Sequence, residues 1–348
     1  MLLRWRGFFV SCRVRNSVFH RHIEGFNQKL AALPLSIDGI TGYAAYYLSE
    51  LIQNREYFLQ IYAQLLELLI GTSLPPKNIS LLDIGSGNGL LGLFAKYCGV
   101  QKIILMEPDK DFLKASEILS QHLGIKPDAF MCSRFEDSES ELDVEYVIGS
   151  DMIEHVYDLD VFIQGLSKLT PVRFVFSSAS NIQNPLIRRR LEKIQQKDEL
   201  IGEDDEESFE KGISGIPYFQ IRKGIIQDHF PELAPEEINA LSHSTRGKNY
   251  YDILDAVKRF RETGYYPIPA EGFNTCDPIT GNWTERMLSF ETYRSMFESH
   301  GFRVKFSNGF YNQWEEGIPG AVKKMLNNFI TLGGFKISPY FVISGSKN

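Results

Sequence analysis

Residues 79–89 read ISLLDIGSGNG, and this stretch decides the fold of the 348-residue chain. Its first six residues form a short apolar run, which is typical of a strand buried on both faces. Gly85, Gly87 and Gly89 then allow a sharp backbone turn and leave room for a ligand against the main chain. The residues from Leu90 onward have a helical pattern, so the amides at the helix N-terminus would point at that ligand. The sequence therefore predicts a ligand-binding loop at the carboxyl edge of a parallel sheet.

Outward from this loop, short apolar runs alternate with helical segments as far as Ser180. The predicted helices are Leu90–Cys98, Asp111–Leu123 and Val161–Leu169. The predicted strands after the first are Ile103–Met106, Ala129–Cys132, Tyr146–Gly149 and Val172–Ser177. This alternation predicts an α/β fold, in which a three-layer, Rossmann-like parallel sheet carries helices on both faces.

The chain divides into four predicted parts. Residues 1–75 are a basic arm followed by a helical segment over about 24–72, and residues 76–180 are the ligand-binding core. Residues 181–288 are polar, aromatic and proline-containing, and we interpret them as an inserted cap over the mouth of the sheet. Residues 289–348 complete the sheet with a helix at 290–300 and strands at 302–306 and 340–344.

Charge and composition narrow the classes of function. The net charge of −7 argues against a general nucleic-acid binder. The four cysteines are too scattered for a metal or redox motif, which favours a reducing, cytoplasmic location. No apolar run is long enough to predict a membrane span, since even Ile61–Ile70 is interrupted by Gln64 and Glu67.

Two charged segments lie outside the predicted core. Residues 1–23 carry five arginines and no acid before Glu24. We interpret this segment as a frayed basic arm, with a weak membrane-surface contact or an organelle-targeting peptide as the alternatives. The acidic run Glu203–Glu207 is typical of a solvated loop.

Asp83 discriminates between the two cofactor classes that use such a loop. The run from Gly87 to Gly92 also satisfies the dinucleotide pattern G-x-G-x-x-G, which is a weak signal alone. A dinucleotide would bring a pyrophosphate that a nearby carboxylate repels, whereas S-adenosylmethionine (SAM) brings an ammonium and a sulfonium group. Asp83 therefore favours SAM, and the alternative is a residue that only caps the turn.

The loop resembles the first motif of the class I SAM-dependent methyltransferases, in which two apolar residues and an acid precede an apolar residue and G-x-G-x-G. The resemblance implies that Glu107, at the end of the next strand and followed by Pro108, receives the ribose hydroxyl protons. After the third strand the family commonly has an acid that holds the adenine amino group. This chain departs from that pattern with Ser133-Arg134-Phe135-Glu136, where we expect Phe135 to pack on the adenine and Ser133 to bond its edge.

The segment from Val147 to Val156 resembles the motif after strand four of small-molecule methyltransferases, including those of ubiquinone biosynthesis, where it lines the methyl-transfer site. The resemblance covers roughly residues 78–180 and the closing elements at 290–348. The cofactor-binding residues that it implies are Asp83, Gly85, Ser86, Gly87, Asn88, Gly89, Glu107, Pro108, Ser133, Arg134, Phe135, Ser150 and Asp151.

His155 and Asp151 are the predicted catalytic residues. A hydroxyl or acidic carbon nucleophile must lose its proton, and histidine titrates in the range that suits a general base. The alternative is that the Glu154-His155 pair only orders the loop. We expect no metal, and the alternative is a divalent cation on Asp151, Glu154 and His155.

The cap is predicted to choose the substrate through an aromatic pocket with a few polar anchors. Its candidate residues, which otherwise form the core of the cap, are Tyr250, Tyr251, Tyr265, Tyr266, Asn282, Trp283 and Arg286. The run Arg188–Arg190 is either an exposed helix face or a contact for an anionic substrate group. The sequence thus predicts SAM-dependent methylation of a small organic molecule, with oxygen as the favoured acceptor. An NAD(P)-dependent oxidoreductase and a non-catalytic SAM-binding protein are the alternatives, and nucleic-acid methylation is less favoured.

Overall fold

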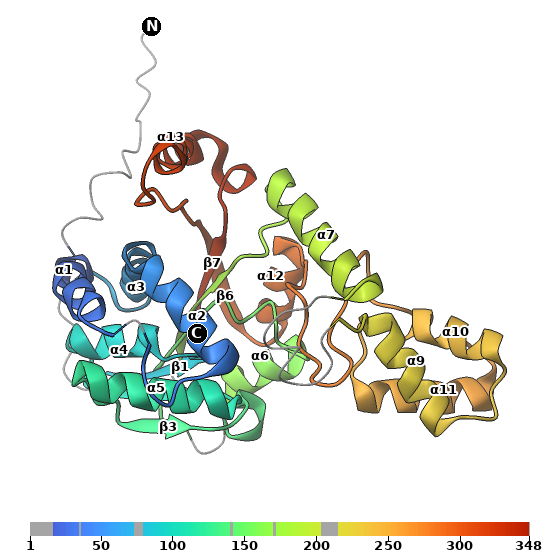
Figure 1. The fold of residues 1–348 in the computed structure, drawn as a ribbon. Coiled ribbons are helices and arrows are strands. Elements are labelled where there is room, and N and C mark those ends of the chain that lie inside the picture. The colour runs from blue at the N-terminus through green and yellow to red at the C-terminus, as the bar shows by residue number, and fades with distance from the viewer. Residues whose placement is uncertain are drawn as a thin grey trace, which may run out of the picture.

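The computed structural model describes residues 17–34, 36–72, 79–139, 142–169, 172–202 and 215–347 (Figure 1). Most of the basic arm, residues 1–16, and the acidic run at 203–207 lie outside the described residues.

One seven-stranded sheet organises the described chain. Its strands are β1 (Ser80–Ile84), β2 (Lys102–Met106), β3 (Ala129–Met131), β4 (Tyr146–Ser150), β5 (Arg173–Ser178), β6 (Phe302–Asn308) and β7 (Phe341–Lys347). Their order is β3-β2-β1-β4-β5-β7-β6, and the first five are parallel while β7 runs antiparallel to both of its neighbours. The α/β, Rossmann-like prediction is therefore confirmed, because the order 3-2-1-4-5 is that of a doubly wound sheet.

The strand order reverses between β1 and β4. The chain leaves β1 toward β2 and β3 on one side, and returns to place β4 on the other side. The loops that follow the adjacent ends of β1 and β4 consequently lie next to each other. Ligands bind at such a switch point in open α/β sheets.

Alternate side chains of β1 enter two separate cores, one on each face of the sheet. Leu81 packs with helices α1 (Val18–Ala31), α3 (Arg55–Ile70), α4 (Leu90–Tyr97) and α5 (Lys110–Leu123). Leu82 packs with α6 (Leu159–Lys168) and α12 (Phe290–Ser299) on the opposite face. This twofold alternation produces the predicted three layers.

The N-terminal part folds as three helices, whereas the sequence pattern predicts a helical segment over about 24–72 without resolving it. Besides α1 and α3, this part contains α2 (Gly42–Gln53), which lies between them in sequence. Helix α1 begins earlier than expected, at Val18, because the Ser17 hydroxyl accepts the amide hydrogen of His20 at 3.2 Å.

Residues 181–288 contain helices that the sequence pattern does not predict. They are α7 (Pro185–Leu200), α9 (Tyr218–His229), α10 (Pro235–Ser244) and α11 (Tyr250–Thr263). Figure 1 shows α9, α10 and α11 grouped at one side of the molecule, away from the sheet. These three helices bury a core of their own, which includes Ile226, Leu241 and Ile253. Tyr251 and Tyr265 are 78% and 82% exposed, so they are not part of this core, and Tyr265 borders a hollow on the outer surface along α11.

A fully buried ion pair joins the cap helices. The Arg222 guanidinium on α9 bonds both carboxylate oxygens of Glu199 on α7 and donates to the Ser242 carbonyl oxygen on α10 at 2.9 Å. Thr275 donates its hydroxyl hydrogen to the same Glu199 carboxylate at 2.8 Å. A buried charge is tolerated only with such complete pairing, so this network fixes α7 against the other cap helices.

The C-terminal strands β6 and β7 are longer than predicted. The helix between them, α13 (Ile318–Gly333), is absent from the sequence prediction. A short 3-10 turn, η4 (Gly334–Lys336), follows it and leads into β7. Among the described residues, no helix has the length and apolar character needed to cross a membrane.

Candidate functional site

Three glycines with left-handed backbone form the loop after β1. Gly85, Gly87 and Gly89 have φ values of 61°, 52° and 74°, a region that disfavours residues with a side chain. A Cβ on Gly89 would also lie 2.9 Å from Leu105 Cδ1 and 2.9 Å from Ser116 Cβ. Both the conformation and the packing therefore require glycine, and α4 begins directly after it.

Asp83 is buried at the end of β1, with 1% of its surface exposed. Its Oδ2 accepts the amide hydrogen of Gly92, in the first turn of α4, at 2.8 Å. Burial raises the pKa of the Asp83 carboxyl to about 8, against the lowering effect of the Gly92 hydrogen bond. The alternative role of Asp83, a residue that caps the turn, is thus compatible with this contact. The raised pKa favours the protonated carboxyl, and a cation bound nearby would shift it to the ionised form.

Glu107 connects the end of β2 to the glycine loop. Its Oε2 accepts the Gly87 amide hydrogen at 2.8 Å, and its Oε1 accepts that of Asp109 at 3.1 Å. Burial raises the pKa of this carboxyl, and the two amide hydrogen bonds lower it in part. Each carboxylate oxygen has a second lone pair, so Glu107 retains the capacity to accept two hydroxyl hydrogens. Pro108 is exposed directly after it.

The two polar side chains of the loop differ in their partners. The buried Ser86 hydroxyl has no hydrogen-bond partner among the described residues. Asn88 donates to the Ala44 carbonyl oxygen of α2 at 3.2 Å, while its own side-chain oxygen is buried and unpartnered within the same residues. An unsatisfied buried hydroxyl costs about 1–3 kcal/mol, so the Ser86 hydroxyl marks a place where a polar ligand group would bind.

Aromatic side chains from α2 and α5 cover the loop, and the sequence analysis did not identify them. The rings of Tyr43, Tyr47 and Phe112 are 5.8–6.3 Å apart, centre to centre. A Cβ on Gly87 would lie 3.8 Å from the Tyr47 ring and 3.9 Å from the Phe112 ring. Burial raises the pKa of Tyr47, and the negative charges of Asp151 and other acids near it add to this effect. The spacing of Tyr43 and Tyr47 by one helical turn was the available signal.

The segment after β3 carries the predicted adenine contacts, and it places the Phe135 ring in the core. Phe135 is 2% exposed and packs edge-on against Phe162 of α6, with the ring centres 5.3 Å apart. Its ring is part of the core and has no free face for an adenine. Ser133 shares a hydrogen bond of 2.7 Å with the Ser138 hydroxyl, and Arg134 donates to the Thr280 carbonyl oxygen at 3.0 Å. Of the cofactor-binding residues predicted in this segment, only Ser133 and Arg134 are accessible.

The loop after β4 places Asp151 beside β5. Asp151 has a φ of 57°, which is strained for a residue with a side chain. Its amide donates to the Ser177 carbonyl oxygen at 3.2 Å, and its Oδ1 accepts the Ala179 amide hydrogen at 3.2 Å. The preceding Ser150 hydroxyl lies 3.1 Å from the Ser177 hydroxyl. These contacts to β5 hold the carboxylate at the switch point despite the strain.

Two further carboxyl groups, those of Glu154 and Glu285, lie near Asp151. Glu154 is fully buried, and its Oε1 accepts the Ala179 amide hydrogen at 2.7 Å. Glu285, which reaches the site from the segment after α11, accepts the Ser180 hydroxyl hydrogen at 3.0 Å. Burial raises the pKa of both groups, and the nearby Asp151 charge raises each of them further. Sequence reasoning did not find Glu285, because it lies 134 residues beyond Asp151 in the chain.

His155 is oriented by a backbone contact with Trp283. Its Nδ1 lies 2.7 Å from the Trp283 carbonyl oxygen, and the Trp283 amide donates to the His155 carbonyl oxygen at 3.3 Å. A carbonyl oxygen only accepts, so Nδ1 carries the hydrogen and, in the neutral ring, Nε2 carries the lone pair. Helix α7 supports this arrangement, since Gln195 donates to the Glu285 carbonyl oxygen at 3.0 Å and accepts the Thr275 amide hydrogen at 2.8 Å.

The alternative metal site is not assembled. Across the part of the chain that the structure describes, no three histidine, cysteine, aspartate or glutamate side chains are grouped to hold a metal ion. Asp151 and Glu154 bond to the Ala179 amide, whereas His155 bonds to Trp283.

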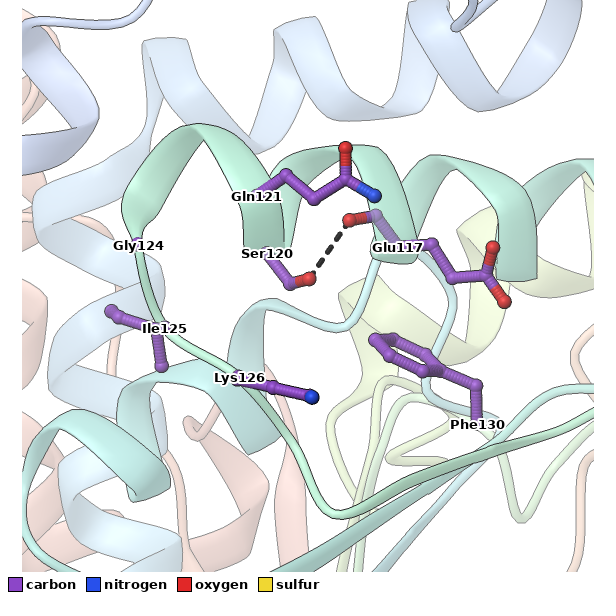
Figure 2. A pocket seen from close by; sticks show the side chains of 7 residues that line it. All are labelled: Glu117, Ser120, Gln121, Gly124, Ile125, Lys126 and Phe130. Carbon is purple, nitrogen blue, oxygen red and sulfur yellow. Dashed lines mark hydrogen bonds between the residues drawn. The ribbon is translucent and has the colours of Figure 1, made fainter.

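Two surface hollows lie outside this site. One, of about 350 Å³, is bounded by the C-terminal half of α5 and by Phe130 of β3. Figure 2 shows the residues that line it and the hydrogen bond from the Ser120 hydroxyl to the Glu117 carbonyl oxygen. The other, of about 480 Å³, lies along α11. Neither is lined by the glycine loop or by the residues around Asp151.

Comparison with known proteins finds similar folds. No family model matches the chain, and no curated protein sequence matches it. A SAM-dependent methyltransferase from Thermotoga maritima, described as a possible histamine N-methyltransferase, is 11% identical, with 88% of this chain and 96% of that chain covered at a TM-score of 0.43. A SAM-dependent methyltransferase from Archaeoglobus fulgidus is 15% identical, with 87% and 100% covered and a TM-score of 0.39. One from Mesorhizobium loti is 10% identical, with 78% and 91% covered and a TM-score of 0.38. At these identities the likeness concerns the fold alone.

Proposed function

We propose that this protein is a SAM-dependent methyltransferase that acts on a small organic molecule, with a hydroxyl oxygen as the favoured acceptor. The observation that carries the proposal is the glycine loop itself: it joins buried carboxyl groups on both sides and lies under a layer of tyrosine and phenylalanine rings.

The residues of the loop fit this cofactor in polarity and in shape. Glu107 would accept the ribose hydroxyl hydrogens while it holds the Gly87 amide. The unpartnered Ser86 hydroxyl would bond a polar group of the amino-acid portion, and the left-handed glycines keep the space beside the main chain free of side chains. Ser133 and Arg134 remain the candidates for the adenine edge.

The charges of the site favour a cationic ligand over a dinucleotide. Asp83, Glu107 and Asp151 lie at the ends of adjacent strands, and burial raises the pKa of Asp83 and Glu107, so a cationic ligand beside them would favour their ionised forms. A pyrophosphate at this loop would meet carboxylates at close range, which opposes an NAD(P)-dependent oxidoreductase. An ammonium or sulfonium group would instead be stabilised by the carboxylates and by the faces of Tyr43 and Tyr47.

For methyl transfer, the protein would mainly have to align the acceptor with the methyl group and remove the acceptor's proton. Bound SAM would supply a methyl group already activated by the sulfonium. His155 would accept the acceptor's proton at Nε2, because its Nδ1 hydrogen is held by the Trp283 carbonyl oxygen. The rings above the loop would exclude water, which strengthens the electrostatic contacts inside the site.

Calorimetric titration with SAM, and separately with NADH, tests the proposal. We expect SAM to bind the wild-type protein and Glu107→Gln to weaken that binding by about tenfold to a hundredfold, since a charged acceptor is replaced by an amide. Glu117→Gln removes one negative charge from an exposed position of α5 and serves as the matched control.

The outcomes separate the competing functions. NADH binding without SAM binding would make the protein an oxidoreductase. SAM binding that Glu107→Gln and Glu117→Gln affect equally would move the cofactor away from this loop. SAM binding without turnover in a broad screen of hydroxyl-containing acceptors would favour the non-catalytic binding protein.

A further inference from the structure

Helix α13 presents a continuous apolar stripe to solvent. Ile318, Val322, Met325, Phe329 and Leu332 recur every three or four residues, which places them on one face of the helix. They are between 45% and 85% exposed. Figure 1 shows α13 standing away from the sheet, and the stripe has no covering element in the described part of the chain. Stripes of this size on one surface helix mark an interaction site.

The orientation of the helix is fixed by its opposite face. Ile330 is buried, and Asn327 forms two hydrogen bonds with the backbone of Tyr311, accepting its amide hydrogen at 2.7 Å and donating to its carbonyl oxygen at 3.1 Å. Gly320 lies so close to the preceding segment that a Cβ there would be 1.8 Å from the Glu315 carbonyl oxygen. The helix is therefore held with its apolar stripe outward.

The charges beside the stripe are positive. Residues 317–348 contain no acid, and Lys324 on α13 and Lys336 in η4 are exposed. Lys323 is paired with Glu315, so of the two acids that precede the helix only Glu316 is left to oppose Lys324 and Lys336. The surroundings of the stripe thus attract anions.

A second group of cations lies next to the end of α13. Asn184, the residue that caps α7, donates to the carbonyl oxygens of Ile337 and Ser338 at 3.0 and 3.1 Å. This contact brings the first turns of α7, with exposed Arg188, Arg189 and Arg190, close to the residues that follow η4. Arg188 is paired with Glu192 on the same helix. The arginine run adds to the positive character of this end of the molecule, on an exposed helix face.

From this arrangement we infer that α13 docks the protein on an anionic membrane surface, with the apolar stripe inserted at the headgroup level and the lysines facing lipid phosphates. A helix with large apolar residues on one face and only lysines as charges is suited to such a surface. Pairing with a second copy of the chain is disfavoured, because α13 itself carries lysines and no acid, so two such helices would bring like charges together along their length. The inference does not depend on the methyl-transfer proposal.

Co-sedimentation of the full chain with lipid vesicles tests the inference. We expect binding to phosphatidylcholine vesicles that contain roughly one-third phosphatidylglycerol, weaker binding to pure phosphatidylcholine, and a decline with salt. Phe329→Ser combined with Leu332→Ser should reduce the bound fraction at least about tenfold, and Lys324→Gln by about fivefold. Tyr265→Ser combined with Ile268→Ser removes apolar groups that are even more exposed, at the end of the cap, and should leave binding unchanged.

Three results would overturn the inference. The first is wild-type protein that stays in the supernatant with anionic vesicles. The second is equal loss of binding in the stripe and control variants. The third is a dimer, measured by light scattering, that the stripe variant converts to a monomer, since α13 would then be an interface between copies. Thermal unfolding of each variant verifies that the fold is retained. SAM titration of the stripe variant keeps a failure here separate from a failure of the proposed enzymatic function.

Discussion

Asp83→Asn tests whether the Asp83 carboxyl group binds the ligand or only accepts the Gly92 amide hydrogen at the start of α4. The asparagine side-chain oxygen has the shape needed to accept the Gly92 amide hydrogen, as Asp83 Oδ2 does at 2.8 Å. The substitution therefore preserves the hydrogen bond from the Gly92 amide and removes only the ionisable group. If Asp83 serves the fold alone, neither stability nor ligand binding should fall.

The size of the effect follows from the pKa. Burial raises the folded-state pKa from its usual 3.8 to about 8, so the folded protein keeps the proton over a range in which the unfolded chain has lost it. Stability therefore falls as the pH rises from 4 to 8 and is constant above that window. One pKa unit is worth about 1.4 kcal/mol, so Asp83 costs roughly 4 kcal/mol at pH 7 and roughly 5–6 kcal/mol above pH 8. The asparagine variant avoids this cost.

We expect Asp83→Asn to raise the midpoint of thermal unfolding by several degrees at pH 8 and by almost nothing at pH 4. Its affinity for SAM should fall, and should lose the increase with pH that ionisation of Asp83 gives the wild-type protein. Fluorescence-monitored melting from pH 4 to 9, together with calorimetry in buffers of different ionisation enthalpy, measures both effects. A variant that is less stable at pH 8, or that binds SAM with the wild-type pH dependence, would refute the reasoning.

Three further outcomes are expected. His155→Ala should lower kcat/KM for a hydroxyl acceptor by about 10²–10⁴-fold with the SAM dissociation constant unchanged; equal losses in both would mean that His155 only orders its loop. Arg222→Met should destabilise the protein by about 3–5 kcal/mol, because it leaves the buried Glu199 charge unpaired, and adding Glu199→Leu should restore most of that loss in thermal unfolding. If the single variant melts like the wild type, the ion pair does not hold the cap. Exhaustive chelation should leave methyl transfer intact, and activity restored only by a divalent metal would contradict the arrangement around Asp151.

The sequence predicted the site best where the backbone conformation itself restricts the type of residue. The glycine pattern required left-handed backbone at three alternate positions, and the structure has it at Gly85, Gly87 and Gly89. The position of Phe135 along the chain, on which its predicted adenine contact rests, does not reveal which way the ring points. In the structure the ring turns into the core, against Phe162 of the next helix.

Contacts between distant segments were beyond the reach of sequence patterns. The hydrogen bond that orients His155 comes from a main-chain carbonyl 128 residues away, and any residue type supplies a carbonyl. The cap helices were missed for a related reason. Their apolar faces cover a small core of their own, and polar and aromatic residues on the remaining faces masked the helical period.

The position of β7 between β5 and β6 constrains the order in which the protein is built. As the chain is synthesised, the five parallel strands come first, and β5 then waits with an unpaired edge while the whole cap and β6 are made. Strand β6 cannot protect that edge, since its partner is β7. An exposed strand edge is a template for unwanted pairing, so a nascent chain stalled before residue 341 would be prone to aggregate. The cap, with its own core, is free to fold during this interval, whereas the sheet is closed only when β7 is inserted between its neighbours.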